Sequence, residues 1–411
     1  MADLRVAVVG ASLAGLRAAE QLRQAGHTGP VTVYGAEPLP PYNRPPLSKD
    51  VLGDAAPAGV DELVARLAFR RRPSVDDVDF RLGTEVFTAD LAAGRLRWMS
   101  DGTRDGTDEF DGLVVATGLS PRRLDVAGPL EGRHVLRTIA DCLGLRAALA
   151  PGSRVVVIGA GFIGCETACT LAAAGHRVTV VEPTGAPMNR VLGTDLAAAV
   201  QRHHEAAGIA FVTGPGVVAF DGHDRVTGVV LDEGARLPAD LVVEAVGSRP
   251  NTGWLDGNGL DLADGVLTDN RLAVVGAGNA VAVGDVARFP NPLFDDTPRR
   301  VEHWSVPTDT AKRAAPTLVA LLRGEQPDQA PFAPIPSFWS DQGDLRFQSF
   351  GSPALADEVR LEEGDLGDLA GGVLTTHHRG GRHVGTVAVN LPPARQRGLR
   401  DAFVALTEAR T

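Results

Sequence analysis

The 411-residue sequence predicts an α/β fold with two parallel β–α–β units followed by a C-terminal α+β region. An apolar strand, a glycine-rich turn, a helical stretch and a second strand occur in this order twice, first from Val6 and again from Arg154. Strands that alternate with helices in this way are typical of a parallel sheet. From Phe332 onward the composition changes, and a proline-rich segment leads into short strands. A chain of this length has room for two or three domains.

The first unit begins with Val6–Val9, an apolar run typical of a buried strand. The turn Gly10–Gly15 follows, and the predicted helix Leu16–Ala25 carries apolar residues on one face. A second strand, Val31–Tyr34, leads to Glu37, an acid about 20 residues beyond the turn. Strand, glycine turn, helix, strand and acid in this order are the context in which such a turn binds a dinucleotide.

The residues of this turn have distinct expected roles. Gly10 permits a tight turn out of the strand, and Gly15 lets the helix pack close to the sheet. Ser12 stands where glycine is usual, but it is small and its hydroxyl can bond a phosphate at the helix N-terminus. Glu37 can accept hydrogen bonds from ribose hydroxyls. The alternative for this turn alone is an ordinary strand–turn–helix with glycines for packing.

The second unit repeats the pattern completely. The strand Val155–Ile158 leads into Gly159–Gly164, a full G-x-G-x-x-G, and then into the helix Cys165–Ala174. The strand Arg177–Val181 ends at the acid Glu182. Two copies in full β–α–β context are far more specific than one glycine motif. The sequence therefore predicts two Rossmann-like dinucleotide-binding domains.

The acid of the second unit bears on the choice of nicotinamide cofactor. A carboxylate at Glu182 can bond the free 2′-hydroxyl of NAD and repel the 2′-phosphate of NADP. The first basic residue after it is Arg190. We therefore expect NADH to be preferred over NADPH.

The other elements are expected as short strands and two long helices. Ligands lie at the carboxyl ends of parallel strands, so a strand that joins the first sheet at Phe110–Gly118 would bring Ala116, Thr117 and Gly118 beside the ligand. The remaining predicted segments are Val226–Leu231, Leu241–Asn251, Val281–Asp285, a helical region from Arg300 to Leu322, strands at Arg346–Phe350 and His383–Val389, and a helix at Ala394–Glu408.

Composition excludes several classes of function. The net charge of -11 argues against a general nucleic-acid-binding protein. No apolar run reaches membrane-spanning length, and the N-terminus lacks the pattern of a signal peptide, so we expect no membrane association and a cytoplasmic location.

The cysteines and histidines offer no clear metal or disulfide site. No C-x-x-C occurs, which excludes the thioredoxin-reductase type of redox centre. Cys165 and Cys169 share one face of a predicted helix; a redox or metal pair is possible, but small core residues are the favoured interpretation. We expect the pairs His203–His204 and His377–His378 at the surface, and no metal ligands.

Six stretches together resemble one family. They are PYNRPPLSK at 41–49, Ala116–Gly118, Gly161–Glu166, Ala282–Asp285, Val301–Trp304 and Phe338–Gln342. In this order they resemble the flavoprotein ferredoxin reductases of oxygenase systems, over essentially the whole chain. The related disulfide reductases carry redox cysteines beside the flavin, whereas residues 44–49 contain none.

The resemblance implies bound FAD and a glutathione-reductase-like plan. An FAD-binding domain would comprise residues 1–117 and 247–325, an NAD-binding domain residues 118–246, and a C-terminal α+β domain residues 326–411. It implies FAD contacts at Gly10, Ser12, Leu13, Ala14, Gly15, Glu37, Arg44, Lys49, Val86, Ala116, Thr117, Gly118, Arg122, Gly284, Asp285, Glu302, His303, Trp304 and Trp339. It implies NADH contacts at Gly159, Gly161, Phe162, Ile163, Gly164, Glu182, Arg190, Ala245, Val246 and Gly247.

The resemblance also implies the reaction. NADH gives two electrons as hydride, an iron–sulfur ferredoxin takes them singly, and a flavin can do both. The ferredoxin would feed a monooxygenase or dioxygenase. Lys49 and Glu166 are the expected catalytic residues, paired near flavin N5. The alternatives are a solvated loop lysine and an acid placed favourably in the first turn of a helix.

Other functions on the same scaffold stay open at this point. One is a rubredoxin reductase or a monodehydroascorbate-type reductase, and another is a redox-sensing protein like apoptosis-inducing factor, which binds FAD and NADH but turns over slowly. A short helix is expected to end in Arg70–Arg72. This basic cluster and Arg299–Arg300 could dock an acidic ferredoxin or be solvated arginines. Trp339 could border the flavin or anchor a core.

Overall fold

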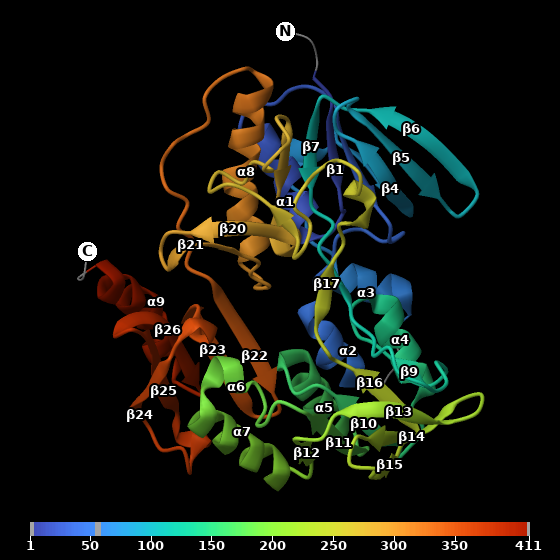
Figure 1. Ribbon diagram of the computed structural model, residues 1–411, viewed down its shortest axis with the longest axis vertical. Coiled ribbons are helices and arrows are strands. Elements are labelled where there is room, and N and C mark those ends of the chain that lie inside the picture. The colour runs from blue at the N-terminus through green and yellow to red at the C-terminus, as the bar shows by residue number, and fades with distance from the viewer. Residues whose placement is uncertain (1–3, 54–58, 409–411) are drawn as a thin grey trace. The chain divides into compact units, whose positions relative to one another are not determined.

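The computed structural model describes residues 4–53 and 59–408. Contacts divide the chain into two compact units, each described by itself below (Figure 1). Unit 1 comprises the described residues of Met1–Asn43, Gly59–Ser120 and Arg249–Pro336. Unit 2 comprises those of Arg44–Ala58, Pro121–Ser248 and Ser337–Thr411. Each unit contains one five-stranded parallel sheet, as the repeated β–α–β pattern predicts.

The parallel sheet of unit 1 has the strand order β19-β7-β1-β2-β3. Its strands are β1 (Val6–Val9), β2 (Val31–Gly35), β3 (Asp79–Leu82), β7 (Gly112–Val115) and β19 (Ala280–Ala282). Strands buried on both faces are nearly continuous apolar runs, which explains the valine-rich sequence of β1 and β7. The helices α1 (Leu13–Gln24) and α8 (Val306–Leu322) pack against each other beside this sheet (Figure 1).

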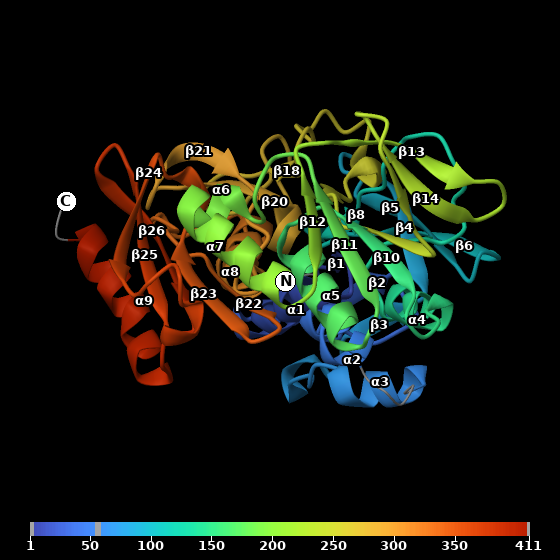
Figure 2. The same ribbon diagram turned by 90° about the horizontal axis from the view of Figure 1, so that it is seen from below.

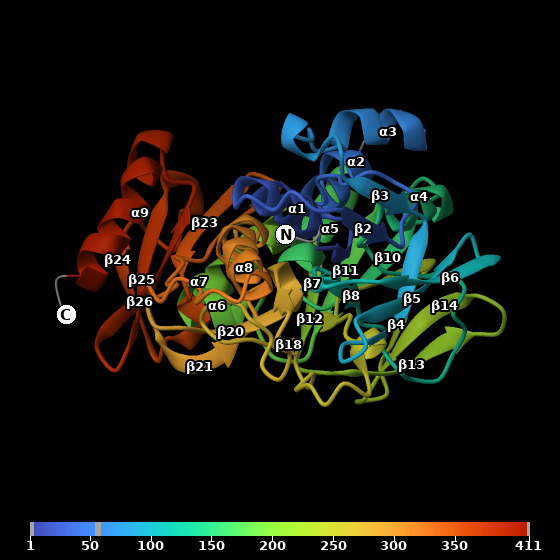
Figure 3. The same ribbon diagram turned by 90° about the horizontal axis from the view of Figure 1, so that it is seen from above.

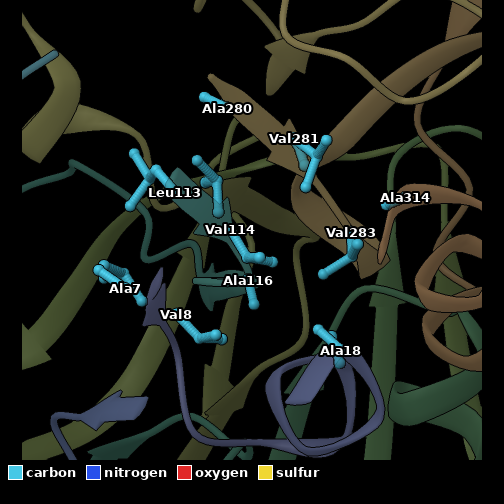
Figure 4. Close-up of a cluster of buried hydrophobic side chains, with 14 of the residues drawn as sticks. Ala7, Val8, Ala18, Leu113, Val114, Ala116, Ala280, Val281, Val283 and Ala314 are labelled. Atoms are coloured by element: carbon cyan, nitrogen blue, oxygen red, sulfur yellow. The ribbon is translucent and has the colours of Figure 1, made fainter. Parts of the chain in front are cut away.

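The core of unit 1 is built from small and β-branched side chains. Val8, Val114 and Val281 come from three neighbouring strands and are completely buried (Figure 4). Ala18 of α1 and Ala314 of α8 are also buried in this cluster (Figure 4). Alanine at these positions adds little bulk, so both helices can pack closely on this cluster.

Unit 1 also contains two three-stranded sheets, one antiparallel and one mixed. One consists of β4 (Thr84–Asp90), β5 (Arg95–Ser100) and β6 (Arg104–Glu109), which lie side by side in Figure 3. In the other, β20 (Ala287–Asn291) pairs with β18 (Val266–Leu267) and, antiparallel, with β21 (Asp295–Arg299). The helix α3 (Val60–Leu67) also belongs to this unit.

The parallel sheet of unit 2 has the order β12-β11-β10-β16-β9. Its strands are β9 (Arg133–His134), β10 (Arg154–Ile158), β11 (Arg177–Glu182), β12 (Ala210–Thr213) and β16 (Leu241–Glu244). The helices are α2 (Asp50–Gly53), α4 (Ile139–Ala148), α5 (Phe162–Ala173), α6 (Asn189–Leu192) and α7 (Thr194–Ala206), preceded by the 3₁₀ turn η1 (Pro45–Ser48). A small sheet of β13 (Val217–Gly222), β14 (Val226–Leu231) and β15 (Arg236–Pro238) is antiparallel. Two short connecting strands, β8 (Leu119–Pro121) and β17 (Ser248–Pro250), form a two-stranded sheet.

The last part of unit 2 is an antiparallel sheet with one helix. The strands β22 (Ser337–Gln342), β23 (Leu345–Gly351), β24 (Glu358–Glu363), β25 (Val373–Arg379) and β26 (Arg382–Val389) have the order β22-β23-β26-β25-β24. The helix α9 (Pro393–Glu408) packs on β26 and β23 (Figure 2). The expected division into three domains stays a prediction, since contacts group this part with residues 121–248.

Several local expectations were wrong. The helical region expected from Arg300 begins only at Val306, because the first helical turn contains Pro307 and the preceding residues are irregular. The arginines at 70–72 do not end a helix, since α3 stops at Leu67. The expectation of surface histidines was wrong for three of them: His204, His377 and His378 are buried, whereas His203 is half-buried.

Within the described residues, no helix is both long enough and apolar enough to cross a membrane.

Candidate functional site

The glycine turn of unit 1 is fixed by close backbone approach. Gly10 has φ +115°, and a Cβ there would overlap the carbonyl group of Ala116 at the end of β7. A Cβ on Gly15 would overlap the carbonyl oxygen of Gly10. Both glycines therefore have the packing roles that the sequence predicts. Ser12 is the N-cap of α1, and no side-chain capping bond is formed there among the described residues.

The start of α1 is suited to an anion. Its first turn consists of Leu13, Ala14, Gly15 and Leu16, which are all uncharged. The first N–H groups of a helix have no partner within the helix and carry partial positive charge. Because the cap supplies no side-chain acceptor, these groups can bind a phosphate. The sequence departure at Ser12 thus leaves the turn competent for a pyrophosphate.

The carboxyl ends of three strands meet at this turn. Gly284 follows β19 with φ +70°, and a Cβ on it would lie 2.8 Å from the Cβ of Ala14. The hydroxyl of Thr117 donates to the carbonyl of Asn251 at 2.7 Å, and the Asn251 amide donates back to the carbonyl of Thr117 at 3.0 Å. The structure therefore brings the expected residues 10–15, 116–118 and 284 together at one edge of the sheet, where ligands of such folds bind.

Glu37 lies shortly after β2, as expected for a carboxylate that bonds a ribose. The phenol of Tyr42 donates a 2.6 Å hydrogen bond to its Oε2. Tyr42 is buried, so this bond fixes the direction of the carboxylate. Sequence reasoning did not assign Tyr42, although its place in the PYNRPPLSK stretch was a signal. Val86 is buried in β4 as part of the unit 1 core.

The segment Glu302–Trp304 precedes α8 in an irregular conformation. Glu302 accepts a 2.9 Å bond from Arg300. Burial lowers the pKa of His303 to about 4, so its imidazole is neutral at pH 7. Trp304 exposes 43% of its surface. The backbone carbonyl of Asp285 accepts from Arg300 at 3.3 Å.

The glycine turn of unit 2 has one position with spare room. Gly159 has φ +97°, and a Cβ there would overlap the carbonyl of Ala245; a Cβ on Gly164 would overlap that of Gly159. By contrast, a Cβ on Gly161 would meet no described atom within 4 Å. The backbone of Gly161 is ordinary, with φ −75°. Glycine at 161 is therefore not required by the fold, which agrees with a space kept for a ligand that approaches the backbone.

The carboxylate of Glu182 is held from both sides. Its Oε2 accepts from the N–H of Ala160 at 2.8 Å, inside the glycine turn. Its Oε1 accepts from the N–H of Thr184 at 2.9 Å and from the Thr184 hydroxyl at 2.6 Å. Arg190 in α6 is exposed. Sequence reasoning named Glu182 but missed Thr184.

The segment that follows β16 is the expected nicotinamide contact, Ala245, Val246 and Gly247. Gly247 has φ +94°, and its carbonyl accepts from the N–H of Arg122 at 2.9 Å. The side chain of Arg122 donates to the carbonyl of Ser248 at 2.7 Å. Arg122 therefore supports this backbone. The side chains Phe162 and Ile163 lie in the first turn of α5, and Ile163 exposes 47% of its surface.

Lys49 and Glu166 form a largely buried ion pair. The Lys49 Nζ lies 2.8 Å from the Glu166 Oε2, with side-chain exposures of 16% and 6%. The hydroxyls of Ser48 and Ser340 donate to the same carboxylate at 2.5 and 2.6 Å. The pairing expected for these two residues is therefore confirmed, and the alternative of a solvated lysine is wrong. Glu166 is the fifth residue of α5, so it lies beyond the first turn.

The other expected residues of unit 2 are Arg44 and Trp339. Arg44 donates from Nη1 to the carbonyl of Arg137 at 2.8 Å. Trp339 exposes 43% of its surface, so it does not anchor a core. Its neighbour Phe338 faces inward and packs on Phe162, with ring centroids 4.6 Å apart. Of the residues expected at FAD, Arg44, Lys49, Arg122 and Trp339 belong to unit 2 and the rest to unit 1.

The three cysteines are free and buried. Burial raises the pKa of Cys142 to about 11 and that of Cys169 to about 12, and raises the pKa of Cys165 well above its usual range. At neutral pH these sulfurs are therefore thiols rather than thiolates. The expectation that Cys165 and Cys169 are core residues is confirmed.

Comparisons with known proteins agree with this geometry. Residues 4–311 match the family described as pyridine nucleotide-disulphide oxidoreductase. A protein of Castellaniella defragrans called probable ferredoxin reductase CtmF is 36% identical over 398 residues, which cover 95% of this chain and 91% of that protein. The putidaredoxin reductase of a covalent complex with putidaredoxin superposes with a TM-score of 0.86 at 29% identity, covering 99% and 94% of the two chains. The ferredoxin reductase of the CYP199A2 system from Rhodopseudomonas palustris gives 0.83 at 33% identity, covering 96% and 93%.

Proposed function

Because the chain belongs to the pyridine nucleotide-disulphide oxidoreductase family, we propose that it is a flavoprotein ferredoxin reductase, which moves electrons from NADH through FAD to an iron–sulfur ferredoxin that serves an oxygenase. The observation that favours a ferredoxin reductase over a disulfide reductase within this family is the burial and protonation of the three cysteine thiols. The three thiols are buried and their pKa values are raised, so no thiolate is available for disulfide chemistry. A serine and a lysine, Ser48 and Lys49, occupy the region in which the disulfide-reducing relatives carry redox cysteines.

The residues present fit FAD in unit 1. The uncapped start of α1 would hold the pyrophosphate, and Glu37, directed by Tyr42, would accept from the ribose. Gly284 and Thr117 border the same strand ends. When bound, FAD accepts the two electrons of a hydride together and releases them singly. The chain itself supplies binding and orientation.

The residues of unit 2 fit a nicotinamide dinucleotide. The space beside Gly161 would admit the pyrophosphate at the start of α5, and Glu182 would accept from the adenosine ribose. We further propose that NADH is preferred over NADPH. The support is that hydrogen bonds from Ala160 and Thr184 fix the Glu182 carboxylate. Its negative charge would therefore stay near the ribose and repel the 2′-phosphate of NADPH.

Lys49 and Glu166 are proposed to set the charge beside the flavin. The ammonium group is paired and little exposed, so it keeps a fixed place instead of moving with solvent. A fixed positive charge there would favour negative charge on a bound flavin, and the Glu166 carboxylate would hold the lysine in that place. Neither residue needs to transfer a proton in this role.

The test is an anaerobic stopped-flow experiment on the purified holoprotein that follows flavin absorbance. NADH should bleach the flavin faster than NADPH at equal concentration, and an excess of a [2Fe–2S] ferredoxin should restore the colour rapidly. Bleaching that persists in the presence of several ferredoxins would instead favour a slow redox-sensing protein. A purified chain that binds no flavin would overturn the proposal.

A further inference from the structure

A row of buried polar side chains continues from the Glu166 carboxylate into the C-terminal sheet of unit 2. Ser340 on β22 donates to Glu166 Oε1 at 2.6 Å. Gln342, two residues further along the strand, lies with its Nε2 3.1 Å from the Ser340 hydroxyl. Its Oε1 lies 2.9 Å from Nε2 of His204 on α7, and Nδ1 of His204 lies 3.6 Å from the thiol of Cys169 on α5.

The row is deeply buried. Ser340 and Gln342 are completely buried, His204 is 2% exposed and Glu166 5%. Leaving a buried polar group without a hydrogen-bond partner lowers the stability of the fold by about 1–3 kcal/mol. A row of buried polar side chains is therefore stable only where each member has a partner. The second N–H of the Gln342 amide is also used, since it donates to the sulfur of Met188 at 3.3 Å.

Chemistry fixes the direction of every bond in the row. An ionised carboxylate only accepts, so Ser340 must donate to Glu166 and its oxygen then accepts from the Gln342 amide. The carbonyl oxygen of Gln342 must accept from His204, which therefore carries its proton on Nε2. Nδ1 of His204 is left as an acceptor for the Cys169 thiol. All four donors therefore point toward Glu166.

Two further facts support this direction. Burial lowers the pKa of His204, although the bond to Gln342 opposes this, so the ring is neutral as the row requires. Burial raises the pKa of Cys169 to about 12, so its sulfur keeps the proton that it donates. Bonds aligned in one sense polarise one another, and each strengthens the next.

The row is not a route for protons. A primary amide does not readily accept and release a proton at neutral pH, and Gln342 interrupts the path between His204 and Ser340. What the row can do is hold a carboxylate oxygen at a fixed place. The second oxygen of Glu166 is fixed separately by Ser48, whose carbonyl accepts from Thr170 at 2.8 Å.

We propose that Ser340, backed by Gln342 and His204, is a positioning residue that aims the Glu166 carboxylate at Lys49 and so sets the rate of flavin reduction by NADH. This inference rests on the proposed function, because it gives the Lys49–Glu166 pair a task beside the flavin. The inference gives the C-terminal sheet a part in flavin reduction. From the sequence, Trp339 was the one residue of this sheet that we expected at the flavin.

The direct test is Ser340→Ala in the holoprotein, studied by anaerobic stopped flow over a range of NADH concentrations. The limiting rate of flavin reduction should fall about 10-fold, the size expected when a carboxylate loses one charge-assisted hydrogen bond. The NADH concentration that gives half of the limiting rate should not change, because Ser340 is completely buried and its hydroxyl bonds Glu166, which is not among the residues expected to bind NADH. Ser340→Thr keeps the hydroxyl and should restore the rate to within about 2-fold.

The chain offers a matched control in Ser349. It lies on the neighbouring strand β23 and is completely buried, and its hydroxyl has no hydrogen-bond partner among the residues that the structure describes. Ser349→Ala should leave the rate of flavin reduction unchanged. If it slows reduction as much as Ser340→Ala does, the effect belongs to general packing and the proposal is wrong. In a Glu166→Gln background, Ser340→Ala should lose most of its effect, since it acts through that carboxylate.

A second measurement needs no turnover. Nitrogen-15 NMR of histidine-labelled holoprotein should show His204 as the neutral tautomer protonated on Nε2 at pH 7. A ring protonated on Nδ1 alone could not donate to Gln342, so it would reverse the row and overturn the proposal even if Ser340→Ala did not fold. The two proposals can fail separately. Wild-type flavin that NADH does not bleach contradicts the proposed function, whereas normal bleaching in both wild type and Ser340→Ala contradicts only the positioning role.

Discussion

The replacement Arg133→Met tests how the segment expected at the nicotinamide is held. Arg133 on β9 is 2% exposed at its side chain and Glu244 at the end of β16 is 0% exposed. The guanidinium donates to both carboxylate oxygens, at 3.1 and 2.9 Å, and also to the carbonyl of Leu124 at 2.8 Å. It lies 4.1 Å from the ring centre of Phe220. Glu244 is followed directly by Ala245–Gly247.

The expected cost follows from what remains around the carboxylate. Removing one partner of a buried ion pair costs about 3–5 kcal/mol, because the other charge is left in a poorly solvated place. Glu244 would keep two donors, the Arg123 guanidinium at 3.1 Å and the N–H of Leu124 at 2.7 Å. We therefore expect the lower end, about 3 kcal/mol. In a unit of roughly 200 residues this lowers the melting temperature by about 6–12 °C.

Differential scanning calorimetry of the holoprotein, with excess FAD to keep the cofactor bound, would measure this. Arg225→Met is the control, since its 3.0 Å pair with Glu131 is exposed at 43% and 69% and should contribute less than about 1 kcal/mol. Adding Glu244→Gln to Arg133→Met removes the stranded charge and should recover most of the loss. The reasoning is refuted if Arg133→Met melts within about 2 °C of wild type, or if the double variant is no more stable than the single.

Three other predictions concern the dinucleotide turn, the cofactor preference and acid stability. Gly161→Val should fold normally, because its side chain enters open space, but it should weaken NADH binding at least 10-fold by titration, because that space is the one expected for the dinucleotide. Gly159→Ala should fail to fold, because its Cβ would overlap the carbonyl of Ala245. Equal behaviour of the two variants would contradict this reasoning. Glu182→Gln removes the charge that repels a 2′-phosphate and should raise kcat/KM for NADPH about 10-fold while lowering that for NADH; an unchanged ratio would exclude Glu182 as the discriminator. Burial lowers the pKa of His377 to about 4, so the unfolded chain takes up a proton first as the pH falls, and stability should drop by up to about 3 kcal/mol between pH 6.5 and 4. His377→Gln should flatten the dependence of melting temperature on pH over that range, and an unchanged slope would assign the acid sensitivity to other groups.

The parallel sheets and glycine turns could be predicted from the sequence because their signals are local. A run such as Val155–Ile158 is apolar on both faces, and glycines with φ near +100°, such as Gly10 and Gly159, stand directly after such runs. Glu37 lies shortly beyond the second strand of its unit, and Glu182 is the last residue of the second strand of the other. Each of these features involves neighbouring residues, so periodicity and spacing are enough to find it.

The partners of the Lys49–Glu166 pair could not be predicted in that way. Ser340 lies 174 residues from Glu166 in the sequence, and serine in a strand is an unremarkable residue. The burial of the histidines could not be predicted for a related reason. His204 has polar neighbours in the sequence of its helix, and only the packing of β22 shows that it faces Gln342. The start of α8 was misplaced because the apolar and acidic residues before Pro307 resemble a helical turn.

Because its cysteine thiols are buried, this chain is a convenient background for site-directed labelling. The sequence holds only three cysteines, and all of them are buried. Alkylating reagents attack thiolates that solvent can reach, and burial denies both conditions here. A cysteine introduced at an exposed position would be the single reactive thiol of the folded protein, with no native residue replaced to silence the rest. A spin label or fluorophore attached there could report on ferredoxin docking. If the reagent also began to label Cys142, Cys165 or Cys169, this would show that the fold around that cysteine had opened.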